Sequence, residues 1–308
     1  MKILITGGNG FIGSKLIQEL TRQYNNLEIY CISRSSKKFE NLDSNNLHFI
    51  KHDLLSKEKP KGLPKNIDVI YHLAALSKTF LKQSEARKQF IENVTLTSNV
   101  IKLSEKLSTK KIIFGSSVYV YSGTKSKPFS ENMPLFPEEF LGASKLSSEL
   151  ILKAYSLSSK VNICSLRLFT VYGEGSRDNQ FIPETIRKLS TSSTKAAFGN
   201  PKVTRDFVYI SDVIRALILA LESNIKGYIP INIASGEAIS IGLAVELIQN
   251  ILNSKKDIKY NEMKLQNNKG DSDHSAKIDL ANEILGWKPE IKFETGIRIT
   301  VEKFLSKA

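Results

Sequence analysis

The chain has 308 residues, 41% of them hydrophobic and 24% charged, which is enough to bury one large α/β core together with a smaller second lobe. No apolar stretch approaches the roughly 18 to 20 residues needed to cross a bilayer, so we expect a cytoplasmic protein with no membrane partner. The two cysteines, Cys31 and Cys164, lie in separate apolar runs, and we expect neither a disulfide framework nor a metal site from them.

The chain is strongly basic, because 44 Lys and Arg face 31 Asp and Glu and give a net charge of +13. Such a balance would suit nucleic acid, an anionic surface or a phosphorylated small ligand. The lysines are scattered, however, and no long basic run stands beside interleaved aromatic residues. We therefore expect a solvated basic surface and no nucleic-acid partner.

Short β-rich runs alternate with longer segments of helical period through the first half of the chain, as they do in the βαβ units of a parallel sheet. The predicted strands cover 2–6, 28–33, 48–51, 69–73, 111–115 and 162–168. The predicted helices cover 11–24, 85–107 and 140–158. The pattern indicates an α/β fold with a doubly wound parallel sheet, the Rossmann arrangement, over residues 1–172.

The alternation becomes less regular beyond about Gly173, where helices are predicted at 181–189, 211–222 and 239–252. This predicts a smaller C-terminal α/β substrate lobe over residues 173–308, with some segments returning to the Rossmann sheet. Before it, a stretch rich in Pro and Gly at 123–137 is typical of a substrate loop over the carboxyl edge of such a sheet.

A glycine-rich turn follows the first predicted strand directly and opens the first predicted helix, where Phe11 and Ile12 stand. Its glycines, Gly7, Gly10 and Gly13, are spaced three apart. The first permits a tight turn, the second lets the backbone approach a pyrophosphate, and the third lets helix and strand pack closely. With the helix N-terminus facing the phosphates, this segment predicts a dinucleotide site.

The end of the second predicted strand bears on which dinucleotide is bound, because an acid there would bind the free 2′-hydroxyl of NAD. Ser33 stands at this place and would not repel a 2′-phosphate. Arg34, Lys37 and Lys38 follow and could bind one, although they are equally consistent with an ordinary basic loop. The cofactor prediction is NAD(P), with a slight preference for NADP.

Three further segments are expected along the cofactor. Asp53, followed by Leu54, could accept a hydrogen bond from the adenine amino group or could only cap a helical turn. Asn93, inside a long predicted helix, could support a buried polar network. Small residues that would let the cofactor lie against the backbone close the fourth strand, at Leu73, Ala74 and Ala75.

These residues resemble the extended short-chain dehydrogenase/reductase family, and within it the nucleotide-sugar epimerases, dehydratases and reductases of the UDP-glucose 4-epimerase type. The resemblance implies a nucleotide-sugar substrate and a homodimer that pairs through the helices at 85–107 and 140–158, although those faces could equally be core. It runs through the glycine motif, Asp53, 72–75, Asn93, 114–121, 142–145, 167–173, 205–207 and 285–289.

Members of this family transfer hydride with a Ser or Thr, a Tyr and a Lys, the last two spaced Tyr-x-x-x-Lys on one helix. At that spacing the Lys ammonium can lower the pKa of the phenol and hold the nicotinamide ribose. The resemblance assigns the Ser role to Ser117 and the Lys role to Lys145. Position 141 is Leu, which has no ionisable proton, so the usual acid/base step is missing.

One replacement for the missing phenol is visible in the sequence. Tyr119 stands two residues after Ser117, where related dehydratases carry an acid directed toward the sugar, so its phenol is a candidate catalytic group. The alternative is that Tyr119 and Tyr121 only pack at the strand end. Because the acidic pair of the dehydratases is Val118-Tyr119 here, epimerase or ketoreductase chemistry is favoured over dehydration.

The resemblance also implies residues on the substrate side. Arg205 would bind the diphosphate of a sugar nucleotide, unless it only pairs with Asp206 across a turn. Phe169 would face the nicotinamide, and Thr170, in place of a common Asn, would offer a hydroxyl to the substrate. Asp271 would lie near the nucleotide, but the arginine usual before it is missing.

The sequence thus predicts an NAD(P)-dependent nucleotide-sugar epimerase or 4-ketoreductase. The alternative is an NAD(P)-binding sensor or partner subunit of the same fold that lacks turnover, because Leu141 removes the acid/base group and leaves the cofactor segment intact.

Overall fold

The computed structural model describes residues 1–35, 46–56, 58, 60–78, 81–260 and 274–306. Among the predicted site residues, Asp271 lies outside these described residues, as do Lys37 and Lys38. None of the described helices is long and apolar enough to span a bilayer.

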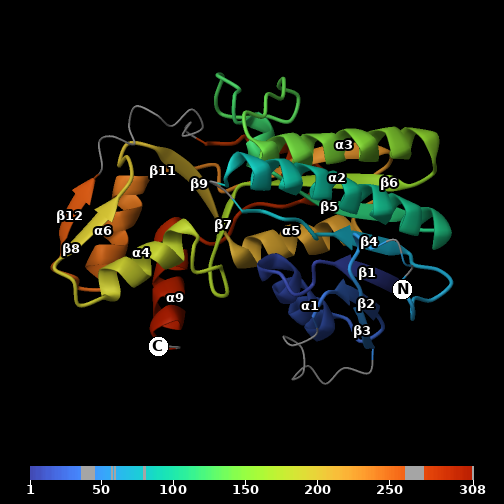
Figure 1. Ribbon diagram of the computed structural model, residues 1–308, viewed down its shortest axis with the longest axis horizontal. Coiled ribbons are helices and arrows are strands. Elements are labelled where there is room, and N and C mark those ends of the chain that lie inside the picture. The colour runs from blue at the N-terminus through green and yellow to red at the C-terminus, as the bar shows by residue number, and fades with distance from the viewer. Residues whose placement is uncertain (36–45, 57, 59, 79–80, 261–273, 307–308) are drawn as a thin grey trace.

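The core of the molecule is a sheet of seven parallel strands in the order β10-β6-β5-β4-β1-β2-β3 (Figure 1). The order reverses direction beside β1, as expected of a doubly wound fold, so this prediction is confirmed. The strands are β1 (Lys2–Thr6), β2 (Glu28–Ser33), β3 (Leu47–Lys51), β4 (Val69–His72), β5 (Lys111–Ser117), β6 (Asn162–Leu168) and β10 (Tyr228–Ile233).

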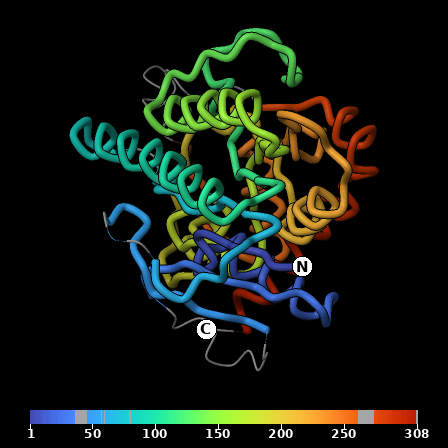
Figure 2. The backbone as a smooth tube through the Cα atoms, turned by 90° about the vertical axis from the view of Figure 1, so that its right-hand side faces the viewer, coloured from blue at the N-terminus to red at the C-terminus, as the bar shows by residue number. Residues whose placement is uncertain are grey.

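Helices cover both faces of this sheet, with α2 (Gln83–Lys106) and α3 (Phe140–Ser158) on one and α1 (Phe11–Gln23) and α5 (Ile210–Glu222) on the other (Figure 1). The central strands are therefore buried on both sides, which explains why β1 and β4 are continuous apolar runs and do not alternate. The 122–139 loop projects beyond α3 in both views (Figures 1 and 2).

The remaining elements form a smaller lobe with two short sheets. One joins β7 (Thr170–Tyr172), β9 (Thr204–Tyr209) and β11 (Ala238–Ser240), and the other joins β8 (Lys195–Phe198) to β12 (Asp257–Tyr260). The helices around them are α4 (Phe181–Ser190), α6 (Ile241–Ile251) and α9 (Phe293–Leu305). The lobe boundary at 172/173 stays a prediction. Although both come later in the chain, β10 belongs to the central sheet and α5 covers one of its faces.

The end of the chain is anchored on α5 by a buried carboxylate. Asp212 accepts hydrogen bonds from the backbone N–H groups of Glu290 and Ile291, each at 3.0 Å. The fully buried Trp287, which follows α8 (Asp279–Leu285), donates its indole N–H to the Asp212 carbonyl at 2.8 Å. This anchor lies on the opposite side of the sheet from α2 and α3.

The predicted element boundaries hold closely where hydrophobic period and turn residues agree. The strands at 2–6, 28–33 and 162–168 and the helix at 140–158 have the predicted limits. By contrast, β5 runs two residues further than predicted, to Ser117, and a 3₁₀ helix, η1 (Val118–Tyr121), follows at once. The Ser117 hydroxyl accepts a hydrogen bond from the Tyr119 backbone N–H at 3.3 Å and so caps η1.

Candidate active site

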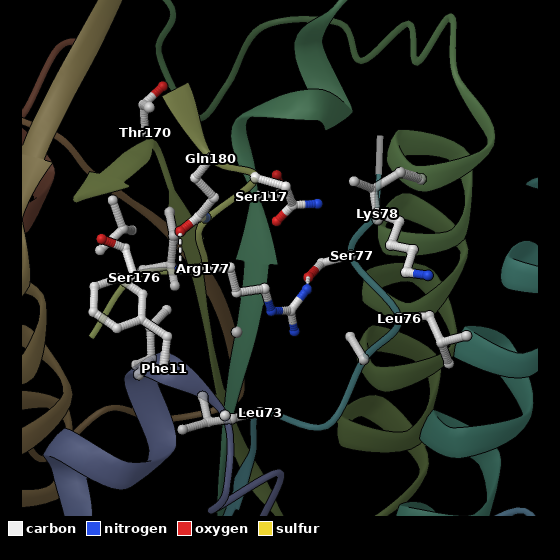
Figure 3. Close-up of a pocket in the computed structure, with 18 of the residues that line it drawn as sticks. Phe11, Leu73, Leu76, Ser77, Lys78, Ser117, Thr170, Ser176, Arg177 and Gln180 are labelled. Atoms are coloured by element: carbon white, nitrogen blue, oxygen red, sulfur yellow. Dashed lines mark hydrogen bonds between the residues drawn. The ribbon is translucent and has the colours of Figure 1, made fainter. Parts of the chain in front are cut away.

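A cavity of about 980 Å³ lies at the carboxyl ends of β1, β2, β4 and β5 and continues toward the smaller lobe (Figure 3). Ligands of doubly wound folds bind at this edge, beside the point where the strand order reverses. The glycine turn lines one end, and residues of β9 and of the 199–203 turn line the other. A long ligand with two polar ends would fit such a space.

The glycine turn is shaped for close approach between backbones. Gly7 has a φ of +76°, and a Cβ at this position would stand 2.6 Å from the Ala74 backbone nitrogen. A Cβ on Gly13 would meet the Gly7 carbonyl. Since α1 begins at Phe11 with Gly10 as its N-cap, its first amides are directed at the cavity and suit a diphosphate.

The part of the cavity beside the ends of β2 and β3 is lined by Ser33, Arg34 and Asp53. The Ser33 hydroxyl donates to the Ser35 carbonyl at 2.7 Å, and Asp53 accepts from the Leu55 backbone N–H at 3.0 Å. Asp53 is therefore a turn cap, as one of its two predicted roles requires, and the contact with adenine stays a prediction. Leu54 also lines the cavity.

The β4–α2 connection forms the facing wall with Leu73, Ala74 and Ala75. Asn93 does not line the cavity but lies behind this wall. It accepts from the Leu76 backbone N–H at 2.8 Å and donates to the Leu76 carbonyl and the Ser144 hydroxyl, each at 3.0 Å. The structure thus places Asn93 in a buried polar network that fixes the wall, because its helix face points toward α3.

The predicted catalytic residues converge on the middle of the cavity from β5, η1 and α3. Ser117, Tyr119, Leu141 and Lys145 all line it. A Cβ on Gly142 would meet the Tyr119 carbonyl, so α3 packs directly against η1. Leu141 is buried, with 5% of its surface exposed.

Lys145 is held without a carboxylate at hydrogen-bond distance in the described part of the chain. Its ammonium donates to the Gly115 carbonyl at 2.6 Å and stands 4.8 Å from the centroid of the Phe114 ring. Burial lowers the pKa of Lys145 to about 8, although the charge of Glu149 one turn along α3 acts in the opposite direction. The group is therefore close to titration at neutral pH.

The two tyrosines of η1 occupy different environments. Tyr121 is fully buried, donates to the Asn232 side-chain oxygen at 3.0 Å and stacks on Phe129. Tyr119 is half-buried, lines the cavity and packs edge-on against His274, with ring centroids 6.0 Å apart. Packing at the strand end therefore describes Tyr121, whereas Tyr119 faces the site.

Phe169, Thr170 and Arg205 line the same cavity, and their contacts with nicotinamide and substrate stay predictions. The buried Asp206 accepts from the backbone N–H groups of Ser235 and Gly236, and burial raises the pKa of Asp206 to about 6. Its carboxylate thus fastens the turn after β10, which is a different task from the pairing with Arg205 considered as the alternative.

The loop between β7 and α4 adds residues that the sequence did not single out. Arg177 extends across the cavity and donates to the Ser77 hydroxyl at 3.2 Å, and its backbone N–H donates to the Gln180 side chain at 3.0 Å (Figure 3). Glycines with positive φ at 173 and 175, directly after a strand, were the available signal for this loop.

The described residues include no cluster of three or more His, Cys, Asp or Glu side chains that could hold a metal ion. Cys31 and Cys164 are both buried, and burial raises the pKa of each thiol to about 12.

The chain is 31% identical to the dTDP-4-dehydro-6-deoxyglucose reductase of Escherichia coli, over 96% of this chain and 95% of that protein. The UDP-glucuronic acid 4-epimerase of Bacillus cereus in complex with UDP-glucuronic acid and NAD superposes with a TM-score of 0.86, 27% identity and full coverage of both chains.

A third relative is the UDP-N-acetylglucosamine 4-epimerase of Methanobrevibacter ruminantium, which has 31% identity and a TM-score of 0.85 and covers 100% of this chain and 99% of that one. Residues 3–234 match the model of the NAD dependent epimerase/dehydratase family. The chain therefore belongs to this family, in the nucleotide-sugar group of the extended short-chain dehydrogenases.

Proposed function

We propose that the protein is an NAD(P)-dependent nucleotide-sugar epimerase or 4-ketoreductase that moves a hydride between sugar C4 and the nicotinamide. One observation carries the proposal: a continuous cavity joins the glycine turn at one end to Arg205 at the other, with Ser117 and Lys145 between them. A sugar nucleotide and a dinucleotide could meet there at their reacting ends. The similarity to the Escherichia coli reductase and the Bacillus cereus epimerase supports this class of substrate.

Each side chain is assigned a role by its position in the cavity. A bound nicotinamide coenzyme supplies the hydride acceptor or donor. Ser117 orients the sugar hydroxyl or keto oxygen, and Lys145 holds the nicotinamide ribose. Arg205 binds the sugar-nucleotide diphosphate with its planar set of donors, and Asp271 is proposed to lie near the nucleotide.

Epimerase or reductase chemistry is preferred over dehydration. The two positions where the family dehydratases carry an acidic pair hold Val118 and Tyr119, and η1 has no acid in its first turn. Val118 is buried, with 3% exposed. Without an acid here, the loss of water from the sugar would lack its proton donor.

We also propose that Tyr119 supplies the proton group that Leu141 lacks. Its phenol lines the cavity, and its backbone is hydrogen bonded to the Ser117 hydroxyl. Both groups would then act on the same sugar oxygen from adjoining positions of one turn.

Replacement of Leu141 by Tyr distinguishes an active enzyme from an NAD(P)-binding sensor or partner subunit without turnover. We expect Leu141→Tyr to raise kcat/KM, because it places a phenol four residues before Lys145 on the same helix face, in addition to the group proposed at Tyr119. Leu141→Phe is the matched control, since it adds the ring without the hydroxyl and should stay near the parent. Turnover is measured with UDP- and dTDP-sugars. Coenzyme binding with no turnover in any of the three proteins would favour the sensor or partner subunit.

Removal of the Tyr119 hydroxyl tests whether this phenol replaces the missing acid/base group. We expect Tyr119→Phe to lower kcat by about 10² to 10⁴ and to leave coenzyme affinity unchanged, because only the proton step is lost. Tyr155→Phe is the control, since it removes a phenol that bonds the Ser104 hydroxyl at 3.2 Å, away from the cavity. Equal turnover in Tyr119→Phe and the parent would show that the proton goes elsewhere.

The proposed preference for NADP rests on Ser33 and Arg34 at the adenosine end. We expect Ser33→Asp to weaken NADPH binding about tenfold or more, because its carboxylate would repel the 2′-phosphate, and to leave NADH binding equal or tighter. Fluorescence titration of both coenzymes measures the ratio. A parent protein that binds NADH more tightly than NADPH would contradict the preference.

We propose that the protein is a homodimer that pairs through α2 and α3. Three apolar side chains on their outer faces are exposed, namely Ile91 at 55%, Leu150 at 57% and Leu157 at 78%. A second copy related by a twofold axis would bury them against the same residues. We expect light scattering to give twice the 34.5 kDa chain mass and Leu150→Glu to give monomers. Leu243→Glu, at an exposed site on α6, should remain dimeric.

A further inference from the structure

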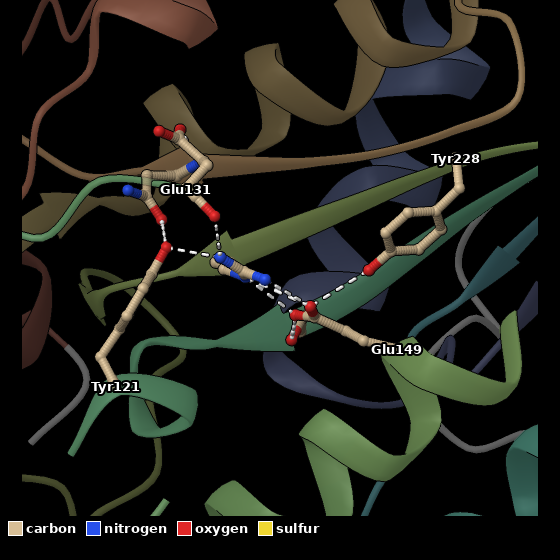
Figure 4. Close-up of polar contacts among 7 residues, drawn as sticks. Tyr121, Glu131, Glu149 and Tyr228 are labelled. Atoms are coloured by element: carbon tan, nitrogen blue, oxygen red, sulfur yellow. Dashed lines mark hydrogen bonds and ion pairs between the residues drawn. The ribbon is translucent and has the colours of Figure 1, made fainter. Parts of the chain in front are cut away.

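A buried ion pair joins two elements that also carry residues lining the cavity, and Figure 4 shows the polar contacts around its carboxylate, Glu149. It joins Arg167 of β6 to Glu149 of α3, whose side chains are 3% and 2% exposed. The guanidinium Nη2 donates to Glu149 Oε2 at 2.7 Å, and Nε lies 3.1 and 3.2 Å from the two carboxylate oxygens. This fork geometry fixes direction as well as distance.

Three further elements and one loop are hydrogen bonded to the same pair. The Ser116 hydroxyl donates to Glu149 Oε1 at 2.5 Å from the end of β5, and the Tyr228 hydroxyl donates to Oε2 at 3.1 Å from β10. Arg167 Nη1 donates to the Tyr121 hydroxyl of η1 at 2.6 Å and to the Glu131 carbonyl of the 122–139 loop at 3.3 Å. The pair is thus the meeting point of β5, η1, α3, β6 and β10.

Four of the network residues are close chain neighbours of residues that line the cavity. Ser116 precedes Ser117, and Tyr121 shares the single turn of η1 with Tyr119. Glu149 follows Lys145 by four residues, one helical turn. Arg167 precedes Phe169 by two residues in the extended chain at the end of β6. A shift in any network contact would therefore be transmitted over one turn or less to a group that lines the cavity.

Stability alone gives a weak reason for such a pair. Two buried charges gain little over well-packed apolar side chains of the same size, because desolvation opposes their attraction. The pair instead contributes directional hydrogen bonds. These bonds hold five elements in fixed orientations, whereas apolar contacts would allow small displacements between them. The active site is where such displacements matter most, since misplacement by about 1 Å lowers rates by as much as 10²-fold.

We propose that Arg167 and Glu149 are positioning residues that set the separation of η1 and α3, and thereby hold Ser117 and Tyr119 opposite Lys145 in the site. The proposal rests on the function proposed above. It predicts that the pair governs the nicotinamide end of the site and leaves the glycine turn, which belongs to β1 and α1, unaffected.

The test uses the full chain with Arg167→Lys, which keeps the charge and loses the fork, and Glu149→Gln, which keeps the shape and loses the charge. Asp212→Asn is the control, because it weakens a comparably buried carboxylate cluster on the opposite side of the sheet. Affinity is measured for NADH and for ADP, which lacks the nicotinamide half, and kcat and KM are measured with the best nucleotide sugar. Thermal melting reports the loss of stability in all three variants.

We expect both pair variants to weaken NADH binding about five- to tenfold, to leave ADP binding within about twofold, and to lower kcat at least tenfold. Asp212→Asn should lower the melting temperature and leave all of these constants unchanged. Unchanged NADH affinity and kcat in folded Arg167→Lys and Glu149→Gln would overturn the proposal, as would equal weakening of NADH and ADP.

Two provisions keep the result decisive. Should either pair variant fail to fold, Tyr121→Phe removes the hydroxyl that accepts from Arg167 Nη1 and donates to Asn232. This variant is expected to show the same selective loss on a smaller scale, and unchanged NADH affinity and kcat in it would overturn the proposal. Should the parent turn over no nucleotide sugar, the proposed function fails while the comparison of NADH with ADP still decides the positioning role.

Discussion

Close approach of backbone to backbone at the carboxyl edge of the sheet is the constraint on which the rest of the structure depends. Gly7 lies against Ala74, and Gly142 lies against the Tyr119 carbonyl, at separations that leave no space for a Cβ. The first contact brings the β4–α2 wall next to the first turn of α1, and the second seats α3 on η1. Both sides of the cavity therefore depend on a glycine that lets two backbone segments lie unusually close together.

Coenzyme binding and proton transfer, the two tasks that the family resemblance implies, are assigned to residues on different elements. The coenzyme cradle is built from β1, α1 and the β4–α2 connection, whereas the groups that would handle a proton stand on η1 and α3. Leu141 belongs to the second set, since it stands on α3, whereas the glycine turn lies between β1 and α1. Under the proposed roles, binding of a coenzyme and turnover of a sugar would therefore depend on different residues.

The fold was largely predictable from the sequence, because the buried parallel strands are apolar runs and the helices have a clear period. The features that the sequence did not predict are either very short or depend on contacts between segments far apart in the chain. The 3₁₀ turn η1 spans four residues, which is too short for a period, and its cap depends on the Ser117 hydroxyl. The strands β7 to β12 are three to six residues long and pair across distant segments. Their strand conformation therefore depends more on the strands they pair with than on their own composition.

The site shows the same limits. The glycine turn could be located from spacing alone, and the residues of β5 and α3 from the family motif. Asn93 was expected at the cofactor, yet whether a helix residue faces a ligand or a neighbouring helix depends on the packing of α2 on α3. Arg177 enters the cavity from a loop without a motif, and the partnership of Arg167 with Glu149 joins residues from two elements whose separation no local pattern reports.

The placement of Lys145 also has a consequence for the folding equilibrium. Burial lowers its pKa from 10.5 to about 8, so at neutral pH the folded chain confines an ammonium that the unfolded chain would leave in water. At about 1.4 kcal/mol for each unit of pKa, this opposes folding by roughly 3 kcal/mol. Between pH 8 and 10.5 the unfolded state binds the extra proton, so the penalty shrinks as the solution becomes alkaline. The position that places Lys145 among the residues lining the cavity therefore costs the folded chain part of its stability below about pH 8.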